Sequence, residues 1–286
     1  TAAAEETTAA AETTAAAEET TAAEETAAGA EETAAAADGE AERTTFTVGF
    51  DAEFPPYGFM DENGEYVGFD LDLAAEVCAR QGWELVKQPI NWDTKDMELS
   101  SGAIDCIWNG FTMTGREDEY TWTVPYVDNS QVFVVAEDSG IETKEDLAGK
   151  VVGVQADSSA LAALEDEENQ ENLDLAASFA SLDQFADYNT AFMELEAGSL
   201  DAVAMDIGVA NYQINQRGGG YEILGGNDPE QCLSTEQYAV GFLLGNDELK
   251  DTVEATLMEM VEDGTFMEIA QKYADYGLVD AVCLGK

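Results

Sequence analysis

Short apolar runs alternate with amphipathic stretches along the chain from residue 46 onward. Four runs rich in Val, Ile, Phe and Tyr predict strands: FTVGF at 46–50, EYVGF at 65–69, WELVKQPI at 83–90 and KVVGVQ at 150–155. DLDLAAEVCARQG at 70–82 has apolar residues at helical spacing, with Asp70 as the expected N-cap and Gly82 as the stop. A further helix is expected from about Ser158. Strands that alternate with helices predict an α/β fold with largely parallel sheets.

Residues 1–45 differ in composition from the rest of the chain, because they consist almost wholly of Ala, Glu and Thr. They include no aromatic and no large aliphatic residue. A segment with nothing to bury cannot offset the entropy that ordering costs. We therefore expect a disordered low-complexity tether that precedes the fold.

An internal repeat relates two parts of the chain. MELSSGAIDCIWNG at 97–110 aligns without a gap with MELEAGSLDAVAMD at 193–206. Each copy is expected to contain the end of a helix, a glycine turn and a buried strand. A single match of this length can arise by chance, but we interpret it as two α/β lobes of similar topology.

The stretch WNGFTMTGRED at 108–118 is predicted to begin as a buried strand, which loses its side chains at Gly110. The hydroxyl of Thr112 and then Arg116 follow this strand end. In the repeat, Gly110 corresponds to Asp206, and open α/β sheets bind ligands beyond the carboxyl ends of their strands. One lobe would then present a cation and the other an anion, which matches the two charges of a free amino acid. The alternative is that Arg116 only neutralises its acidic neighbours.

The chain has 61 acidic and 11 basic residues, which gives a formal net charge of −50. Nucleic acid and anionic membrane surfaces would repel such a chain, so neither is expected as a partner. The sequence has no His, which removes the commonest general base and the commonest metal ligand. No metal site and no cofactor are therefore expected. No apolar run is long enough to span a bilayer.

Seven stretches, taken in order, resemble the extracellular solute-binding proteins of polar amino-acid ABC transporters, family 3. They are FDAEFPPYGF, EYVGFDLDLAAEV, IDCIWNGFTMTGR, TWTVPYVDNS, VGVQADSS, LDAVAMD and STEQYAVGF. The resemblance covers about residues 46–280. It implies the two-lobed periplasmic-binding-protein fold of type 2, in which the chain crosses twice between the lobes and ligand binding closes them.

The resemblance also places the two crossings, near Val127–Gln131 and near Leu233–Tyr238. Lobe 1 would then consist of residues 46–128 and 237–286, and lobe 2 of residues 129–236.

Site residues follow from the resemblance position by position. Arg116 matches the arginine that binds the ligand α-carboxylate, because a guanidinium grips a carboxylate with two parallel hydrogen bonds. Asp206 matches the acid that receives the α-ammonium. Further candidates in the same cleft are Asn109, Gly110, Thr112, Ser158, Ser159 and, in addition, Gln155. Only Gly115 separates Thr114 from Arg116, where the usual pattern of the family has two residues.

The aromatic positions that sandwich the ligand side chain fall on Phe54 and Trp92, and Asp51 matches a position that contacts its distal end. Glu53 lies in the same loop. Two acids beside two rings favour a cationic amino acid such as arginine or lysine, and glutamine, histidine and cystine are the other options. Aspartate and glutamate are expected to bind worst. The alternative is core packing for the rings and solvation for the acids.

The four cysteines form no CxxC pair, which argues against a zinc or redox site. In an exported chain we expect two disulfides, Cys78–Cys106 and Cys232–Cys283, because the first helix should cover the strand of Cys106 and the second pair flanks the returning segment. Buried free thiols are the alternative.

These observations predict a monomeric binding protein, without enzymatic activity, that delivers a free amino acid to the membrane permease of an ABC transporter. We expect an exported protein whose signal peptide has been removed. It would lie in the periplasm or on the cell surface, anchored as a lipoprotein through an N-terminal cysteine missing from this sequence. A dehydratase-type enzyme on the same fold and a ligand-sensing receptor ectodomain are the alternatives. The enzyme would have to use carboxylates as its acid and base.

Overall fold

The computed structural model describes residues 43–226 and 231–286. The tether predicted for residues 1–45 therefore lies almost wholly outside the described residues. The first strand starts at Thr45, one residue before the predicted FTVGF run. Within the described ranges, every helix is too short or too polar to cross a bilayer.

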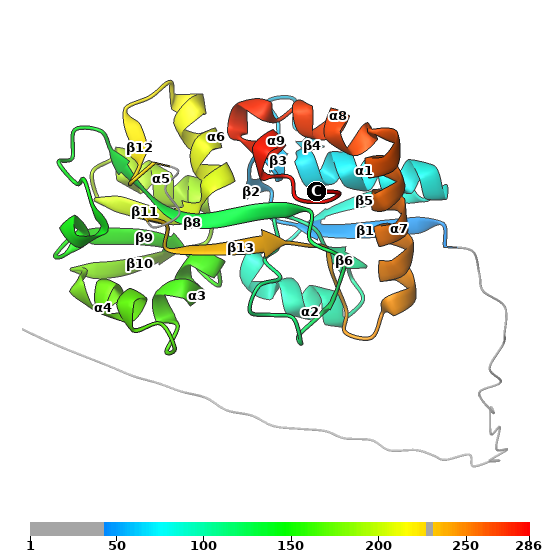
Figure 1. Ribbon diagram of the computed structural model, residues 1–286, viewed down its shortest axis with the longest axis horizontal. Coiled ribbons are helices and arrows are strands. Elements are labelled where there is room, and N and C mark those ends of the chain that lie inside the picture. Colours follow the sequence, from blue (N-terminus) through cyan, green and yellow to red (C-terminus); the bar gives the residue numbers. More distant parts are fainter. Residues whose placement is uncertain (1–42, 227–230) are drawn as a thin grey trace, which may run out of the picture. The chain divides into compact units, whose positions relative to one another are not determined.

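Two main sheets, one in each lobe, and one small sheet organise the fold (Figure 1). The first sheet has the order β5-β1-β6-β14-β7, with β1 (Thr45–Phe50), β5 (Glu84–Pro89), β6 (Cys106–Ile107), β7 (Thr121–Trp122) and β14 (Gly241–Phe242). The second has the order β10-β9-β11-β8-β12, with β8 (Val127–Ala136), β9 (Val151–Gln155), β10 (Ser181–Phe185), β11 (Ala202–Asp206) and β12 (Tyr221–Ile223). The small sheet joins β2 (Glu53–Phe54), β3 (Gly58–Met60) and β4 (Tyr66–Val67). Strand β1 is parallel to β5 and β6, and β9 is parallel to β10 and β11, as predicted.

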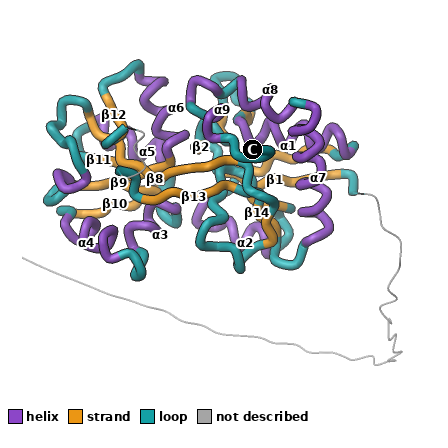
Figure 2. Tube along the Cα trace, viewed as in Figure 1, coloured by secondary structure: helices purple, strands orange, loops and turns teal. Residues whose placement is uncertain are grey.

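Helices flank the strands of each lobe (Figure 2). The α-helices are α1 (Phe69–Gln81), α2 (Lys95–Ser100), α3 (Ser159–Glu165), α4 (Gln170–Ser178), α5 (Tyr188–Glu196), α6 (Ile207–Arg217), α7 (Asp247–Asp263), α8 (Thr265–Gln271) and α9 (Leu278–Ala281). Short 3-10 helices are η1 (Trp92–Thr94), η2 (Lys144–Leu147) and η3 (Ala274–Tyr276). Helix α1 ends at Gly82 in the left-handed conformation, and α3 starts after its N-cap Ser158, both as expected.

The internal repeat is confirmed in three dimensions. The first copy contains helix α2 and strand β6, and the second contains helix α5 and strand β11. A glycine with positive φ ends the turn in each copy, with φ of 76° at Gly102 and 75° at Gly198. Each position needs a glycine because other residues rarely adopt this conformation.

The aspartates of the repeat have the same structural role in both lobes. Asp105 accepts a hydrogen bond from the backbone N–H of Thr47 at 2.7 Å, and Asp201 accepts one from Val151 at 2.9 Å. Thr47 lies in β1 and Val151 begins β9. The repeated aspartate therefore fixes the start of one strand to the neighbouring strand in each lobe.

Strand β8 and strand β13 (Ser234–Tyr238) connect the two lobes. They pair antiparallel over residues 127–131 and 234–238, and lie side by side in Figure 1. The exact lobe boundaries, after residues 128 and 236, stay predictions.

The expected N-cap of the first helix was wrong. Gly68 is the N-cap of α1, and a Cβ atom there would lie 2.2 Å from the carbonyl oxygen of Tyr57. Phe69 begins the helix, so the strand predicted at 65–69 shrinks to β4. Asp70 lies inside the helix, fully buried, and accepts hydrogen bonds from the Gly110 N–H at 2.6 Å and the Tyr126 hydroxyl at 2.8 Å. Its carboxylate therefore joins two segments instead of capping its own helix.

Stability should fall as the pH rises from about 4 to about 7, because burial raises the pKa of Asp70 from 3.8 to about 7. In this range the folded protein binds a proton that the unfolded chain has lost. The stabilisation is therefore complete below the unfolded pKa of 3.8 and is lost as the pH rises through the folded pKa of about 7. Asp70→Asn should reduce the pH dependence by up to about 1.4 kcal/mol per pH unit. Urea unfolding of both proteins at pH 5 and pH 8 measures this. Equal pH dependence would show that Asp70 ionises normally.

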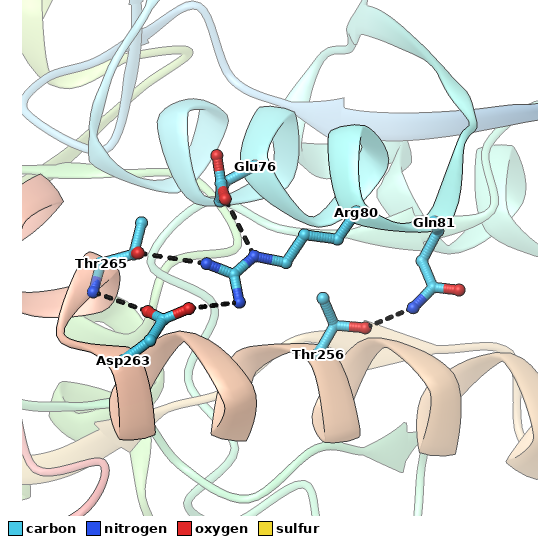
Figure 3. A network of polar contacts seen from close by, with 6 residues as sticks. All are labelled: Glu76, Arg80, Gln81, Thr256, Asp263 and Thr265. Carbon is cyan, nitrogen blue, oxygen red and sulfur yellow. Dashed lines mark hydrogen bonds and ion pairs between the residues drawn. The ribbon is translucent and has the colours of Figure 1, made fainter.

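The returning C-terminal segment is fixed to α1 by a polar network (Figure 3). Arg80 forms ion pairs with Glu76 and with Asp263, both at 2.8 Å, and donates to the Thr265 hydroxyl at 3.1 Å. The hydrogen bond from Arg80 lowers the pKa of Asp263 to about 2. One arginine therefore connects α1 to the junction of α7 and α8, and so builds the first lobe from two distant parts of the chain.

The buried Cys78 and Cys106 and the partly buried Cys283 are thiols in the structure. Neither expected disulfide is formed here. Burial raises the pKa of Cys78 to about 11 and raises that of Cys106, where Asp105 and Cys78 add to the effect. Cys78 on α1 and Cys106 on β6 belong to the same core cluster. The pairings Cys78–Cys106 and Cys232–Cys283 stay predictions that non-reducing peptide mapping can test.

Candidate functional site

Most of the predicted ligand-binding residues follow the carboxyl ends of parallel strands. In the first lobe, Asp51 follows β1, Trp92 follows β5, and Asn109 and Gly110 follow β6. In the second lobe, Gln155 ends β9 and Asp206 ends β11. These two edges are brought together, as expected for ligand sites of open α/β sheets.

The two edges are in direct contact. Gln155 donates to Asp51 at 2.7 Å, and the Ser159 hydroxyl donates to the Thr112 hydroxyl at 2.9 Å. Ser158 is occupied as the N-cap of α3, where its hydroxyl accepts from the Leu161 N–H at 3.2 Å. The structure therefore shows the lobes closed on each other.

A cavity of about 370 Å³ lies at the end of this contact and is strongly acidic. Four carboxylate side chains line it together with Trp92; they are Asp51, Glu53, Glu98 and Asp187, and we call it the acidic cavity. Burial raises the pKa of Asp51 to about 6, and the nearby charges of Asp187 and Glu53 add to the rise. A cation in the cavity would relieve this crowding of negative charge.

Sequence reasoning found Asp51 and Glu53 but missed the other two acids. Glu98 comes from α2 and Asp187 is the N-cap of α5, so both belong to the repeated helices. Their side chains differ in no visible way from the many other acids of the chain. Only the position of Glu98 within the MEL motif marked it, and the repeat alone did not indicate a cavity.

The rings of Phe54 and Trp92 are parallel within 2°, with centroids 6.5 Å apart. A flat group between two rings needs about two van der Waals separations, roughly 7 Å. The observed pair is close to that spacing. Phe54 also packs against Tyr57 and Tyr188, which fixes its orientation.

Arg116 is half-buried and forms no ion pair with any carboxylate in residues 43–226 and 231–286. Its guanidinium donates to the Thr112 carbonyl at 3.4 Å and lies 5.6 Å from the centre of the Phe111 ring. The interpretation that it neutralises its acidic neighbours therefore has no support in the described contacts. Gly115, with φ of 83°, lies in the short turn that precedes Arg116.

Gly110 and Asn109 face the site, but their polar groups are partly occupied. The N–H of Gly110, one of the predicted cleft residues, is bonded to Asp70. Gly110 also has φ of 56°, and a Cβ atom there would lie 2.9 Å from Phe54 and 3.0 Å from Tyr238. The side-chain oxygen of Asn109 accepts from the Asp51 N–H at 3.0 Å, and its buried amide nitrogen has no partner within the described residues.

Asp206 is buried and surrounded by donors. Its Oδ1 accepts from the amide of Asn129 at 2.8 Å, from that of Gln131 at 2.7 Å and from the Tyr238 hydroxyl. Burial raises the pKa of Asp206 to about 7, and the charge of Glu236 is the next cause. Glu236 accepts from Thr112 at 2.9 Å. Glu236 was not among the predicted site residues, although it lies within the quoted STEQYAVGF motif.

An ion pair missed by the sequence reasoning also joins the lobes. Lys95 on α2 is only 2% exposed and pairs with Asp157, which precedes α3. The Lys95 ammonium lies 5.3 Å from the centre of the Trp92 ring. Asp157 is 52% exposed at its side chain and has φ of 56°, a conformation that asparagine also tolerates.

Asp157→Asn should weaken ligand binding by about 1 to 3 kcal/mol, because it leaves the buried Lys95 without a counter-charge in the closed form. The open form loses much less, because Lys95 can then be solvated. Calorimetric titration of both proteins measures the change. The double variant Asp157→Asn with Lys95→Met should recover part of the loss. Unchanged affinity in the single variant would show that the pair does not stabilise closure.

A model of the bacterial extracellular solute-binding proteins, family 3, matches residues 46–276 of this chain. Among curated proteins, the L-cystine-binding protein TcyJ of Escherichia coli (strain K12) is 27% identical over 235 residues, which span 81% of this chain and 83% of that protein. The lysine/arginine/ornithine-binding periplasmic protein of the same strain is 26% identical over 238 residues, which span 82% of this chain and 89% of that protein.

A solved structure, described as an ancestral arginine-binding protein bound to arginine, is similar over 81% of this chain and 99% of that one. The TM-score is 0.71 and the sequence identity is 36%. The similarity therefore covers nearly the whole part of the chain that the structure describes.

Proposed function

Because the chain belongs to family 3 of the bacterial extracellular solute-binding proteins, we propose that it binds a free cationic amino acid and delivers it to the membrane permease of an ABC transporter. The observation that carries the ligand class is the acidic cavity beside Trp92. The four acids that line it face a single space between the lobes, where the burial of Asp51 strengthens its effect on a bound charge. The described residues of its lining include no basic side chain.

The aromatic pair and the acidic cavity suit a long, flat cationic side chain. Its stem would pass between Phe54 and Trp92, and its tip would reach Asp51 and Glu53. An aromatic face attracts a cation by about 0.5–2 kcal/mol, and a carboxylate adds a charge-assisted hydrogen bond. Arginine fits both features, since its guanidinium is planar and always charged.

The α-groups of the ligand would be held at the other end of the contact between the lobes. Arg116 would bind the α-carboxylate, close to the contact between the hydroxyls of Thr112 and Ser159. Asp206 would receive the α-ammonium. The half-buried guanidinium has no carboxylate partner among the described residues, and a guanidinium suits a carboxylate because it can form two parallel hydrogen bonds with it, which supports this assignment.

We propose binding without turnover, by an exported monomer in the periplasm or on the cell surface, where a lipid anchor would attach it. The curated relatives bind cystine or lysine, arginine and ornithine according to their names, and an arginine-bound structure is similar to this chain. These relatives support amino-acid binding. A dehydratase on the same fold would have to use carboxylates of the cleft, such as Asp51 and Asp206, as its acid and base.

Calorimetric titration with arginine, lysine, histidine, glutamine, cystine and glutamate, in one buffer at fixed salt, tests the proposal. Arginine or lysine should bind tightest and glutamate weakest. Glutamate binding tightest would overturn the cationic assignment and leave amino-acid binding intact. No binding by any amino acid would overturn the proposed function. Turnover of prephenate-like substrates would favour the enzyme alternative.

A further inference from the structure

Two buried acids lie together on strands that pair with the connecting strand β8. Asp206 ends β11, and Glu236 lies in β13. The amide nitrogen of Asn129 donates to Asp206 at 2.8 Å and to Glu236 at 2.7 Å. The amide nitrogen of Gln131 donates to the same two oxygens, at 2.7 Å each. The two carboxylates are therefore held by one pair of shared donors.

The shared donors bring the carboxylates of Asp206 and Glu236 close together at a site that is almost inaccessible to solvent. One nitrogen atom separates the two carboxylate oxygens in each bridge, and Asp206 is 4% and Glu236 8% exposed. Carboxylates at this range in a buried site do not both ionise easily, because desolvation and mutual repulsion add. We therefore expect the pair to hold one proton when no ligand is bound.

The groups that face the pair offer little compensation. They are the hydroxyls of Tyr57, Tyr188 and Tyr238 and the base Arg116, and Tyr57 also lies near the acid Asp70. Arg116 is the one cation in this group, and its guanidinium donates to the Thr112 carbonyl at 3.4 Å. Burial raises the pKa of both Asp206 and Glu236. No full positive charge contacts either acid in the part of the chain that the structure describes.

The side-chain amides of Asn129 and Gln131 also have hydrogen-bond acceptors that are not used within the described residues. The side-chain oxygens of Asn129 and Gln131 are buried and have no hydrogen-bond partner within the described residues. Both side chains are more than nine-tenths buried, at 4% and 0% exposure. The site therefore has negative charge and unused acceptors, which suits a ligand group that carries a positive charge and several N–H donors. A primary ammonium is such a group.

We propose that Glu236 is a second acid of the ammonium subsite, and that the α-ammonium of the ligand displaces one proton shared between Asp206 and Glu236. The inference rests on the proposed function, since it needs an amino acid in the cleft. The step is an exchange of charge without any change of covalent bonds in the ligand. The ammonium enters with its three N–H groups, the shared proton leaves to solvent, and both acids then stay ionised around the bound cation.

The position of the pair also couples the ammonium to the connection between the lobes. Asn129 and Gln131 lie in β8, and Glu236 and Tyr238 lie in β13, over the stretch where these two strands pair. A ligand that neutralises the acid pair therefore stabilises side chains of both connecting strands. A ligand with a blocked ammonium would lack this effect.

Proton release on binding tests the proposal. Calorimetric titration with L-arginine at pH 6, in buffers of different ionisation enthalpy, gives the number of protons exchanged. The Asp51→Asn variant is used beside the parent, because burial also raises the pKa of Asp51. In that variant a release of between one half and one proton is expected. Its Kd should fall up to tenfold per pH unit between pH 5 and pH 7 and level off above.

Glu236→Gln supplies the comparison. In the Asp51→Asn background it should abolish most of the proton release and weaken arginine binding about tenfold or more. Glu84→Gln, at an exposed glutamate at the start of β5, is the matched control and should leave both quantities unchanged. Arginine binding without proton release in the Asp51→Asn protein would overturn the two-acid subsite, whether or not the Glu236 variant folds. Absence of amino-acid binding by the parent would overturn the proposed function and this inference with it.

Discussion

Replacing Arg116 with lysine should weaken amino-acid binding by roughly 30-fold or more. Loss of a buried charged hydrogen-bond partner typically costs about 2–5 kcal/mol, and the point charge of lysine cannot form the two parallel bonds of a guanidinium. The structure adds that Arg116 is half-buried beside Phe111, with no carboxylate of the described residues paired to it. Titration of the variant with arginine and lysine measures the effect.

The matched control for this variant is Arg43→Lys. Arg43 forms an ion pair with Asp105 at 2.8 Å at an exposed site. The Arg43→Lys protein should therefore bind the ligand with the affinity of the parent. If the Arg116 variant binds within a factor of two of the parent, the α-carboxylate site lies elsewhere. Arg116 then does not contribute to ligand binding.

Asp51→Asn should weaken arginine binding by about 10- to 150-fold and change glutamine binding much less. Hydrogen bonds to charged groups contribute about 1.5–3 kcal/mol, and the variant removes the most buried charge of the acidic cavity. An asparagine can still accept from Gln155, so the contact between the lobes is kept. The ratio of arginine to glutamine affinity is the quantity to compare.

Asp183→Asn is the control for this comparison, because Asp183 is exposed on β10 and away from the cleft contacts. It should leave the ratio unchanged. An equal loss for arginine and glutamine in the Asp51 variant would mean that Asp51 organises the cleft through Gln155 and the Asn109 contact without reading the charge of the side chain.

The cleft itself also limits which substitutions are informative. Gly110 has positive φ and lies against Phe54 and Tyr238, so any side chain there would disturb the ring pair as well as the backbone. Ser158 caps α3, so its removal changes the helix start. Substitutions at Arg116, Asp51 and Glu236 exchange groups of similar size, and their effects can be assigned to charge and hydrogen bonding.

The sequence by itself determined the architecture of the protein. Short apolar runs that alternate with helical patterns predicted the α/β class. The repeat at 97–110 and 193–206 predicted two lobes, because it carries the glycines and the aspartates that both lobes need. These features are local, since a glycine with positive φ and a strand-starting aspartate depend on a few neighbouring residues. Arg116, which follows Gly110, and Asp206, at the end of β11, predicted which strand ends meet.

Only the tertiary structure decided what the acids do. Asp70, predicted as a helix cap, is a buried acceptor for the Gly110 N–H, because Gly68 starts the helix earlier. Glu98 and Asp187 line the acidic cavity, and Glu236 joins Asp206 through shared amides. In a chain with 61 acidic residues, the residue type alone cannot separate a solvated carboxylate from a functional one. The difference is burial and long-range contact, and both arise only when distant strands and helices pack together.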